Sequence, residues 1–125
     1  MTWSARSLQP ELPMIEILVS GSITHADSDD MRAAARVLLA ENGVSLVLYD
    51  ATDLMHLPSS TDIIKVADSI VATNVPVGFR NAHVRPSDLT AAMWTDHWVA
   101  AANNRGIPTA SFHTRAEAID WLLAD

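Results

Sequence analysis

The chain has 125 residues, a length typical of one domain. Fifteen acidic residues against eight basic ones give a formal net charge of −7, and the single lysine, Lys65, leaves no basic stripe to neutralise phosphates. Nucleic acid and anionic membrane are therefore not expected as partners. The absence of cysteine excludes disulfides and thiolate chemistry. No apolar run reaches the roughly 18 residues of a membrane span or resembles a secretory signal, which favours a cytoplasmic protein.

The first half of the chain predicts two strands, a helix and a third strand. A short edge strand is expected at Trp3–Leu8, beside a mostly buried strand at Met14–Ser20. Capping oxygens beginning at Thr24 open a helix with apolar residues at helical spacing, and Gly43 follows as its left-handed C-terminal cap. The segment Val44–Tyr49 has too little polarity for a half-exposed strand, so it is expected in the centre of the sheet.

The second half continues this alternation of helices and strands. The predicted elements are a helix at Thr61–Thr73, a strand at Val75–Phe79, a helix at Pro86–Asn104, a strand at Thr109–Phe112 and a last helix opened by the capping box Thr114–Glu117. The pattern predicts an α/β fold with a mixed, largely parallel sheet of four to five strands and four main helices.

The loop between the third strand and the second helix concentrates polar groups. Asp50 and Asp53 follow the central strand, and Ser59, Ser60 and Thr61 stand at the expected start of a helix, where free backbone N–H groups attract anions. One interpretation is that Ser59 only caps this helix. A phosphate at the same position would also be tolerated, because it lies at the positive end of the helix dipole.

The run from Leu48 to Thr61 resembles the signature of STAS domains, in which a central strand leads through a short apolar loop into Asp-Ser-Ser-Gly at a helix start. Ile17–Ser22 is similar to the preceding strand and its exit in that family. The ending of the chain, with Phe112 and Trp121, is similar to the SpoIIAA-like branch, the anti-sigma-factor antagonists. The resemblance implies a single STAS-like domain over residues 1–125.

In STAS antagonists a partner kinase phosphorylates the first serine of the signature, which corresponds to Ser59. This sequence departs from the family at two positions, with Pro58 in place of aspartate and Thr61 in place of glycine. The resemblance implies a non-enzymatic regulatory or binding module. It is expected to act on a protein partner through the surface around Asp53 and Ser59, with Ser59 or Ser60 as a phosphorylation switch.

Catalysis and metal binding are not indicated. The five histidines stand on five different segments without a paired spacing: His25, His56, His83, His97 and His113. No Gly-x-Ser-x-Gly nucleophile elbow and no calcium loop occurs. We therefore expect no metal, no cofactor and no enzymatic activity.

The predicted helix Pro86–Asn104 carries a wide apolar arc that contains Met93, Trp94, His97 and Trp98. The spacing predicts a buried His97, hydrogen-bonded in the core, with both tryptophans completing the packing. Alternatively, the tryptophans line a ligand pocket or a subunit contact, as in a homodimer. The alternative function is thus a small carrier of an apolar or lipid-like molecule, which the related CRAL-TRIO lipid-binding domains would also imply.

Overall fold

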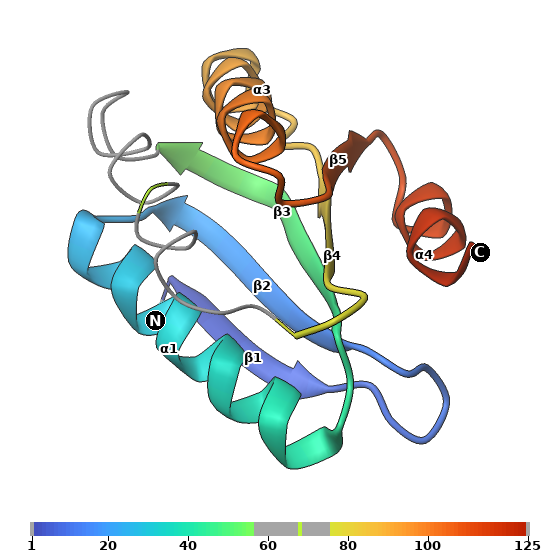
Figure 1. The fold of residues 1–125 in the computed structure, drawn as a ribbon. Coiled ribbons are helices and arrows are strands. Elements are labelled where there is room, and N and C mark those ends of the chain that lie inside the picture. Colours follow the sequence, from blue (N-terminus) through green and yellow to red (C-terminus); the bar gives the residue numbers. More distant parts are fainter. Residues whose placement is uncertain (1, 57–67, 69–75, 125) are drawn as a thin grey trace.

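The computed structural model describes residues 2–56, 68 and 76–124, which form one five-stranded mixed sheet and three helices (Figure 1). The strands are β1 (Trp3–Ser7), β2 (Ile15–Ser22), β3 (Leu46–His56), β4 (Arg80–Val84) and β5 (Thr109–Phe112). The helices are α1 (His25–Asn42), α3 (Leu89–Asn104) and α4 (Arg115–Leu123). The predicted α/β class is therefore confirmed.

The strands lie in the sheet in chain order, β1-β2-β3-β4-β5. The pair β1–β2 is antiparallel, and the other three neighbouring pairs are parallel. Because parallel crossovers are right-handed and each step moves the same way along the sheet, α1 and α3 lie on one face. The last helix, α4, follows β5 without a further crossover and packs on the opposite face (Figure 1).

Several predicted element ends agree with the structure. The strand at Thr109–Phe112 is found with the expected bounds. Thr24 caps α1 through a capping box with Asp27, and Gly43 ends the helix with a positive φ of 62°. Apart from Asp68, which is helical, the predicted helix at Thr61–Thr73 lies outside the described residues, where three helices are defined rather than the four expected.

The central strand is longer than the sequence indicated. The segment after Asp50 was expected to be a loop, but β3 continues to His56. Ala51 and Leu54 are buried in this extension, and its backbone pairs with β2 as far as the match of Ser22 with His56. At two register shifts β3 carries one more residue than β2 does, and these extra residues hide the usual alternation of polar and apolar side chains along β3.

The strand predicted at Val75–Phe79 is wrong. Val77 is fully exposed in a turn that the Phe79 N–H closes by donating to the Pro76 carbonyl, and Gly78 supplies the positive φ of 80°. The strand itself, β4, begins at Arg80. The sequence of β4 looks polar, although the strand is mostly buried in the sheet. The alternation of apolar residues therefore placed the predicted strand a few positions too early in the chain.

Two cores hold the layers together. One lies between the sheet and α1 with the start of α3, and its fully buried side chains include Ile15, Ile17 and Ala91. The other lies under α4 and includes Met14 and Leu48. Helix α4 packs over β3, β4 and β5, so among the described elements no helix covers β1 and β2 on that face.

Candidate functional site

The far end of β3 presents polar and apolar side chains to solvent. Asp53 and His56 are exposed, and Met55 is 45% exposed. Asp50 is more sheltered: its Oδ1 accepts hydrogen bonds from the Thr52 N–H at 3.2 Å and the Thr52 hydroxyl at 2.7 Å. Asp50 and Asp53 are thus both on β3, although a loop was expected there, and only Asp53 is free to meet a partner.

The predicted switch residues Ser59 and Ser60 lie outside the described residues. Their role therefore stays a prediction that rests on the sequence.

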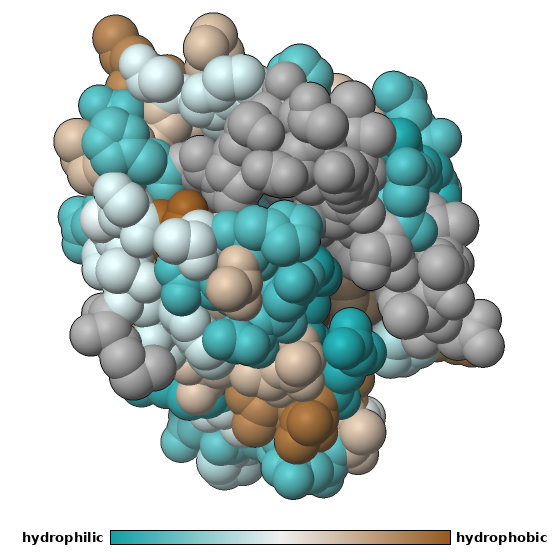
Figure 2. Space-filling model, turned by 90° about the vertical axis from the view of Figure 1, so that its left-hand side faces the viewer, coloured by the Kyte–Doolittle hydropathy of each residue, from teal (hydrophilic) through white to brown (hydrophobic). Residues whose placement is uncertain are grey.

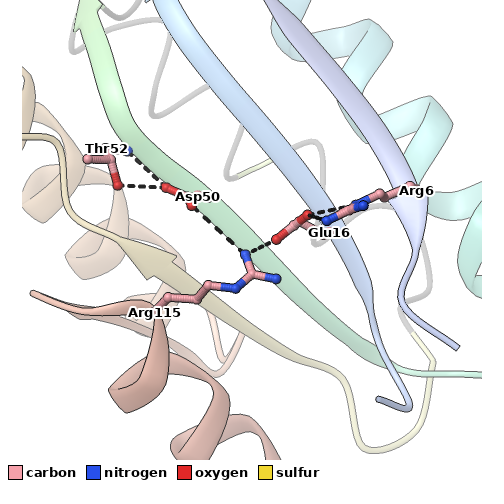
Figure 3. A network of polar contacts seen from close by, with 5 residues as sticks. All are labelled: Arg6, Glu16, Asp50, Thr52 and Arg115. Carbon is pink, nitrogen blue, oxygen red and sulfur yellow. Dashed lines mark hydrogen bonds and ion pairs between the residues drawn. The ribbon is translucent and has the colours of Figure 1, made fainter. Parts of the chain in front are cut away.

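A buried carboxylate organises the face of the sheet that α4 leaves partly open. Glu16 on β2 has no exposed surface. Its Oε1 accepts from the Arg6 guanidinium of β1 at 2.9 Å, and its Oε2 accepts from Arg115 of α4 (Figure 3). Asp50 lies 3.9 Å from the same Arg115 guanidinium, so the charges alternate across three strands and the start of a helix. We call these four residues, Arg6, Glu16, Asp50 and Arg115, the Glu16 network.

The position of Arg115 indicates why the network matters. A positive charge in the first turn of a helix opposes the helix dipole and is mildly unfavourable. Here the guanidinium reaches Glu16 and Asp50 instead, and it joins α4 to the middle of the sheet. Thr114 caps the same turn: its hydroxyl accepts from the Glu117 N–H at 3.2 Å and donates to the Glu117 carboxylate at 3.0 Å. This realises the predicted pairing of Thr114 with Glu117, but the carboxylate meets the hydroxyl rather than the backbone.

A second polar cluster lies inside the opposite face. Tyr49 and His83 are opposite each other on β3 and β4, and their rings stack at a centroid distance of 4.7 Å. The indole N–H of Trp98 donates to His83 Nε2 at 3.0 Å, which leaves the ring proton of a neutral imidazole on Nδ1. We call these three residues the Tyr49–His83–Trp98 cluster.

Burial shifts the pKa values of both titratable residues of this cluster, His83 and Tyr49. Loss of hydration lowers the pKa of His83 from 6.5 to about 4, so the ring is neutral at pH 7. Burial raises the pKa of Tyr49 to about 12, and the nearby Arg32 charge opposes this rise. The sequence analysis did not predict this cluster. Tyr49 and His83 each stand at the fourth position of a parallel strand, and this equal position could have indicated that they are neighbours in the sheet.

The fold is similar to a solved structure of an uncharacterized protein from the DUF3478 family of Shewanella loihica PV-4, described as having a SpoIIAA-like fold. The TM-score is 0.56 at 20% identity, over 96% of this chain and 91% of that one. This chain has a SpoIIAA-like fold. No family model matches the sequence, and no curated protein does.

Within this SpoIIAA-like fold, α3 differs from the prediction made for it. His97 is exposed and stacks on Trp94 at a centroid distance of 5.9 Å, so the predicted burial of His97 is wrong. The buried side of α3 instead consists of small residues: Ala91, Ala92, Thr95, Ala101 and Ala102. Small side chains let α3 approach the sheet closely. Because the apolar arc of this helix is wide, the sequence alone did not indicate which part of the arc faces the sheet.

The four residues assigned to a pocket beside α3 have different environments. Met93 is 58% exposed, whereas Trp98 is half-buried and bound to His83. A hollow of about 700 Å³ lies elsewhere, at the end of α1, and Met93, Trp94, His97 and Trp98 are not among its lining residues.

Metal and membrane sites receive no support from the described part of the chain. No cluster of three or more histidine, aspartate or glutamate side chains suited to a metal occurs there. Within the same residues, none of the helices has the length and apolar character needed to cross a bilayer.

We predict that Glu16→Ala lowers the free energy of unfolding by about 2–3 kcal/mol. This is less than the roughly 3–5 kcal/mol for breaking a fully buried pair, because both arginines reach water. Urea titration at pH 7 measures the change. The control is Glu11→Ala, at an exposed position, with an expected change within about 0.5 kcal/mol. Equal effects of the two substitutions would contradict the role of Glu16.

We predict that His83 makes stability depend on pH. Its pKa is about 4 in the folded chain, and its ordinary value of 6.5 applies when unfolded, so between these values the unfolded state binds the extra proton. The free energy of unfolding therefore falls as pH drops from 6.5 to 4, by up to about 1.4 kcal/mol per unit from this group. Urea titrations across this range should show a shallower slope for His83→Gln than for the exposed-site control His97→Gln. Identical slopes would rule out a buried neutral His83.

Proposed function

We propose that this chain is a non-enzymatic, STAS-like regulatory module that binds a protein partner through the surface around Asp53 and Ser59. The observation that carries this proposal is the extension of β3, which brings Asp53 and Met55 to solvent at the carboxyl end of the central strand. The SpoIIAA-like fold supports the module class. Phosphorylation of Ser59 or Ser60 is the proposed control of binding.

The chemistry of this surface suits protein recognition. Asp53 pairs in register with Ser20 of β2, and His56 pairs with Ser22, so two strands together present short polar side chains, one carboxylate and one flexible thioether, Met55. Methionine adapts to irregular apolar surfaces, and an isolated carboxylate gives orientation. A complementary partner would offer an apolar depression with a basic rim.

The location of the residues with shifted pKa values favours binding over catalysis at this surface. Tyr49 and His83, whose pKa values are strongly shifted, pack against the core, Tyr49 partly buried and His83 buried, rather than at this surface. Shifted pKa values commonly mark catalytic groups, but here burial in the sheet accounts for them. The exposed end of β3 instead offers the Met55 side chain and the Asp53 carboxylate for contact with a partner protein.

Charge also supports the proposed switch. A phosphate on Ser59 or Ser60 adds up to about two negative charges to a chain segment that follows Asp50 and Asp53 closely. The whole protein already carries a net charge of −7. Added negative charge would weaken binding to an acidic or apolar partner surface and strengthen binding to a basic one, without requiring any change in the fold.

Comparative affinity capture from the source cell tests this function. The baits are the wild type, Asp53→Lys and Asp120→Lys, where Asp120 is an exposed acid on α4. We expect one protein to be retained by the wild type and the Asp120 variant and lost with the Asp53 variant. Ser59→Ala and Ser59→Asp should then bind that protein with different affinities. Identical capture by all baits, and no phosphate on Ser59 or Ser60 in native protein, would contradict the proposal.

The second candidate function is a small carrier of an apolar molecule. Its support is the outer side of α3, where Leu89 is 87% exposed and Met93 is 58% exposed, next to the half-buried Trp94 and Trp98. Large apolar side chains in water at such exposure often mark a contact with another molecule.

Tryptophan emission distinguishes the carrier from the protein-binding module. In a variant with Trp3 and Trp121 changed to phenylalanine, the signal comes from the two α3 tryptophans. Titration with 1-decanol should change emission saturably if a pocket exists, and a further Trp98→Phe change should reduce that response. An unchanged spectrum at saturating decanol would exclude the carrier.

A further inference from the structure

Among the strands that the structure describes, none pairs with the outer side of β1, which leaves one row of its backbone groups open. At the two ends of β1, Thr2 O accepts a hydrogen bond from Ser20 N–H, and Leu8 N–H donates one to Met14 O, next to the start of β2. In an antiparallel ladder such pairs alternate, so the even-numbered residues of β1 bond to β2. The N–H and C=O groups of Trp3, Ala5 and Ser7 therefore point away from the sheet, at its edge.

This edge is only partly protected: Arg6 points inward to Glu16 and α1 packs on one side of β1, but no described strand pairs with its outer backbone groups. Natural edges are protected by lysine, proline, bulges, inward-pointing charges or a covering helix or loop. The one charged residue of β1, Arg6, is bound to Glu16 over the open face of the sheet, away from the edge. By contrast β5, at the other edge, has α3 and α4 packed against it.

The side of α1 that flanks this edge has a defined chemistry. Arg32 is near Tyr49 of β3, and Arg36 lines the hollow with Val44, so this side of α1 faces β3. A row on the opposite side therefore extends past β1. Its members, three or four residues apart, are Asp30, Ala34, Val37 and Glu41. Val37 is 54% exposed, and the acids at both ends of the row are exposed.

We infer that the β1 edge binds an extended segment of another protein as an added strand, with the residue pattern basic-x-apolar-x-basic facing α1. The row on α1 is acidic, apolar and acidic, so the charges are complementary. Asp30 and Glu41 lie about 16 Å apart along the helix. The five-residue pattern spans about 13–14 Å in a strand, and long basic side chains cover the difference.

A single strand fits this edge better than a second copy of the chain. Helix α1 packs more closely over β1 than over β2, so pairing two β1 edges would bring two α1 helices and their acidic rows together. The coloured residues on the side of the molecule seen in Figure 2 are mostly hydrophilic, with a small apolar area low on it. This surface contains neither Asp53 nor Met55, so the inference does not rest on the proposed function.

Amide hydrogen exchange tests the arrangement directly. In the free protein the amides of Trp3, Ala5 and Ser7 should exchange fast, and those of Ser4 and Arg6 slowly. The probe is a capped seven-residue peptide in which threonine alternates with lysine, valine and lysine. At saturation it should slow the three edge amides at least tenfold. Edge amides already protected in the free protein, or protected increasingly with protein concentration as a second copy would produce, would overturn the inference.

Matched variants test the charge and the edge separately. Glu41→Lys should weaken peptide binding at least fivefold, whereas Glu11→Lys, the same change at an exposed site in the β1–β2 connection, should not. Ala5→Pro removes an edge N–H that β2 does not use, so it should abolish binding and leave the thermal midpoint nearly unchanged. If the proline variant fails to fold, the two lysine variants decide alone. Equal weakening by both lysine variants would mean unspecific charge attraction and overturn the inference.

Discussion

The carboxylate of Glu16 is the constraint on which the open half of the sheet depends. A fully buried charge is costly unless it is paired and hydrogen-bonded, so the two arginines that bind it are fixed with it. One arginine comes from the edge strand and the other from the last helix, which are 109 positions apart in the chain (Arg6 and Arg115). One side chain thus aligns the antiparallel edge strand, the central strands and α4, and it leaves the rest of that face open.

The sequence was informative where a single local force decides the structure. Caps such as Thr24 and Gly43 follow from turn chemistry, and the structure has them and the short strand at Thr109–Phe112 as predicted. The run from Leu48 to Thr61 led to the correct fold class through a family resemblance. Its functional part, Ser59 and Ser60, is outside the described residues.

Other features depend on contacts between distant segments, which periodicity does not reveal. The buried histidine is His83 rather than His97, because β4 is enclosed on both faces while α3 turns small residues inward. Glu16 reads as an ordinary polar interruption of an apolar strand, and its burial follows only from Arg6 and Arg115. A strand that looked polar, Arg80–Val84, was missed for the same reason.

The long third strand has a consequence for how the sheet opens. Strand β4 pairs with β3 only as far as Asp50. Beyond that residue the described strands that pair with β3 reduce to β2, with two further backbone bonds, from Ser87 N–H to Thr52 O and from Ile23 N–H to His56 O. Local opening follows the number of hydrogen bonds and buried contacts that must break. The segment from Ala51 to His56 thus forms a separate, weaker unit of cooperativity at the end of a firmly held strand. A molecule that binds this segment would therefore change the free energy of its local opening while the rest of β3 stays paired on both sides.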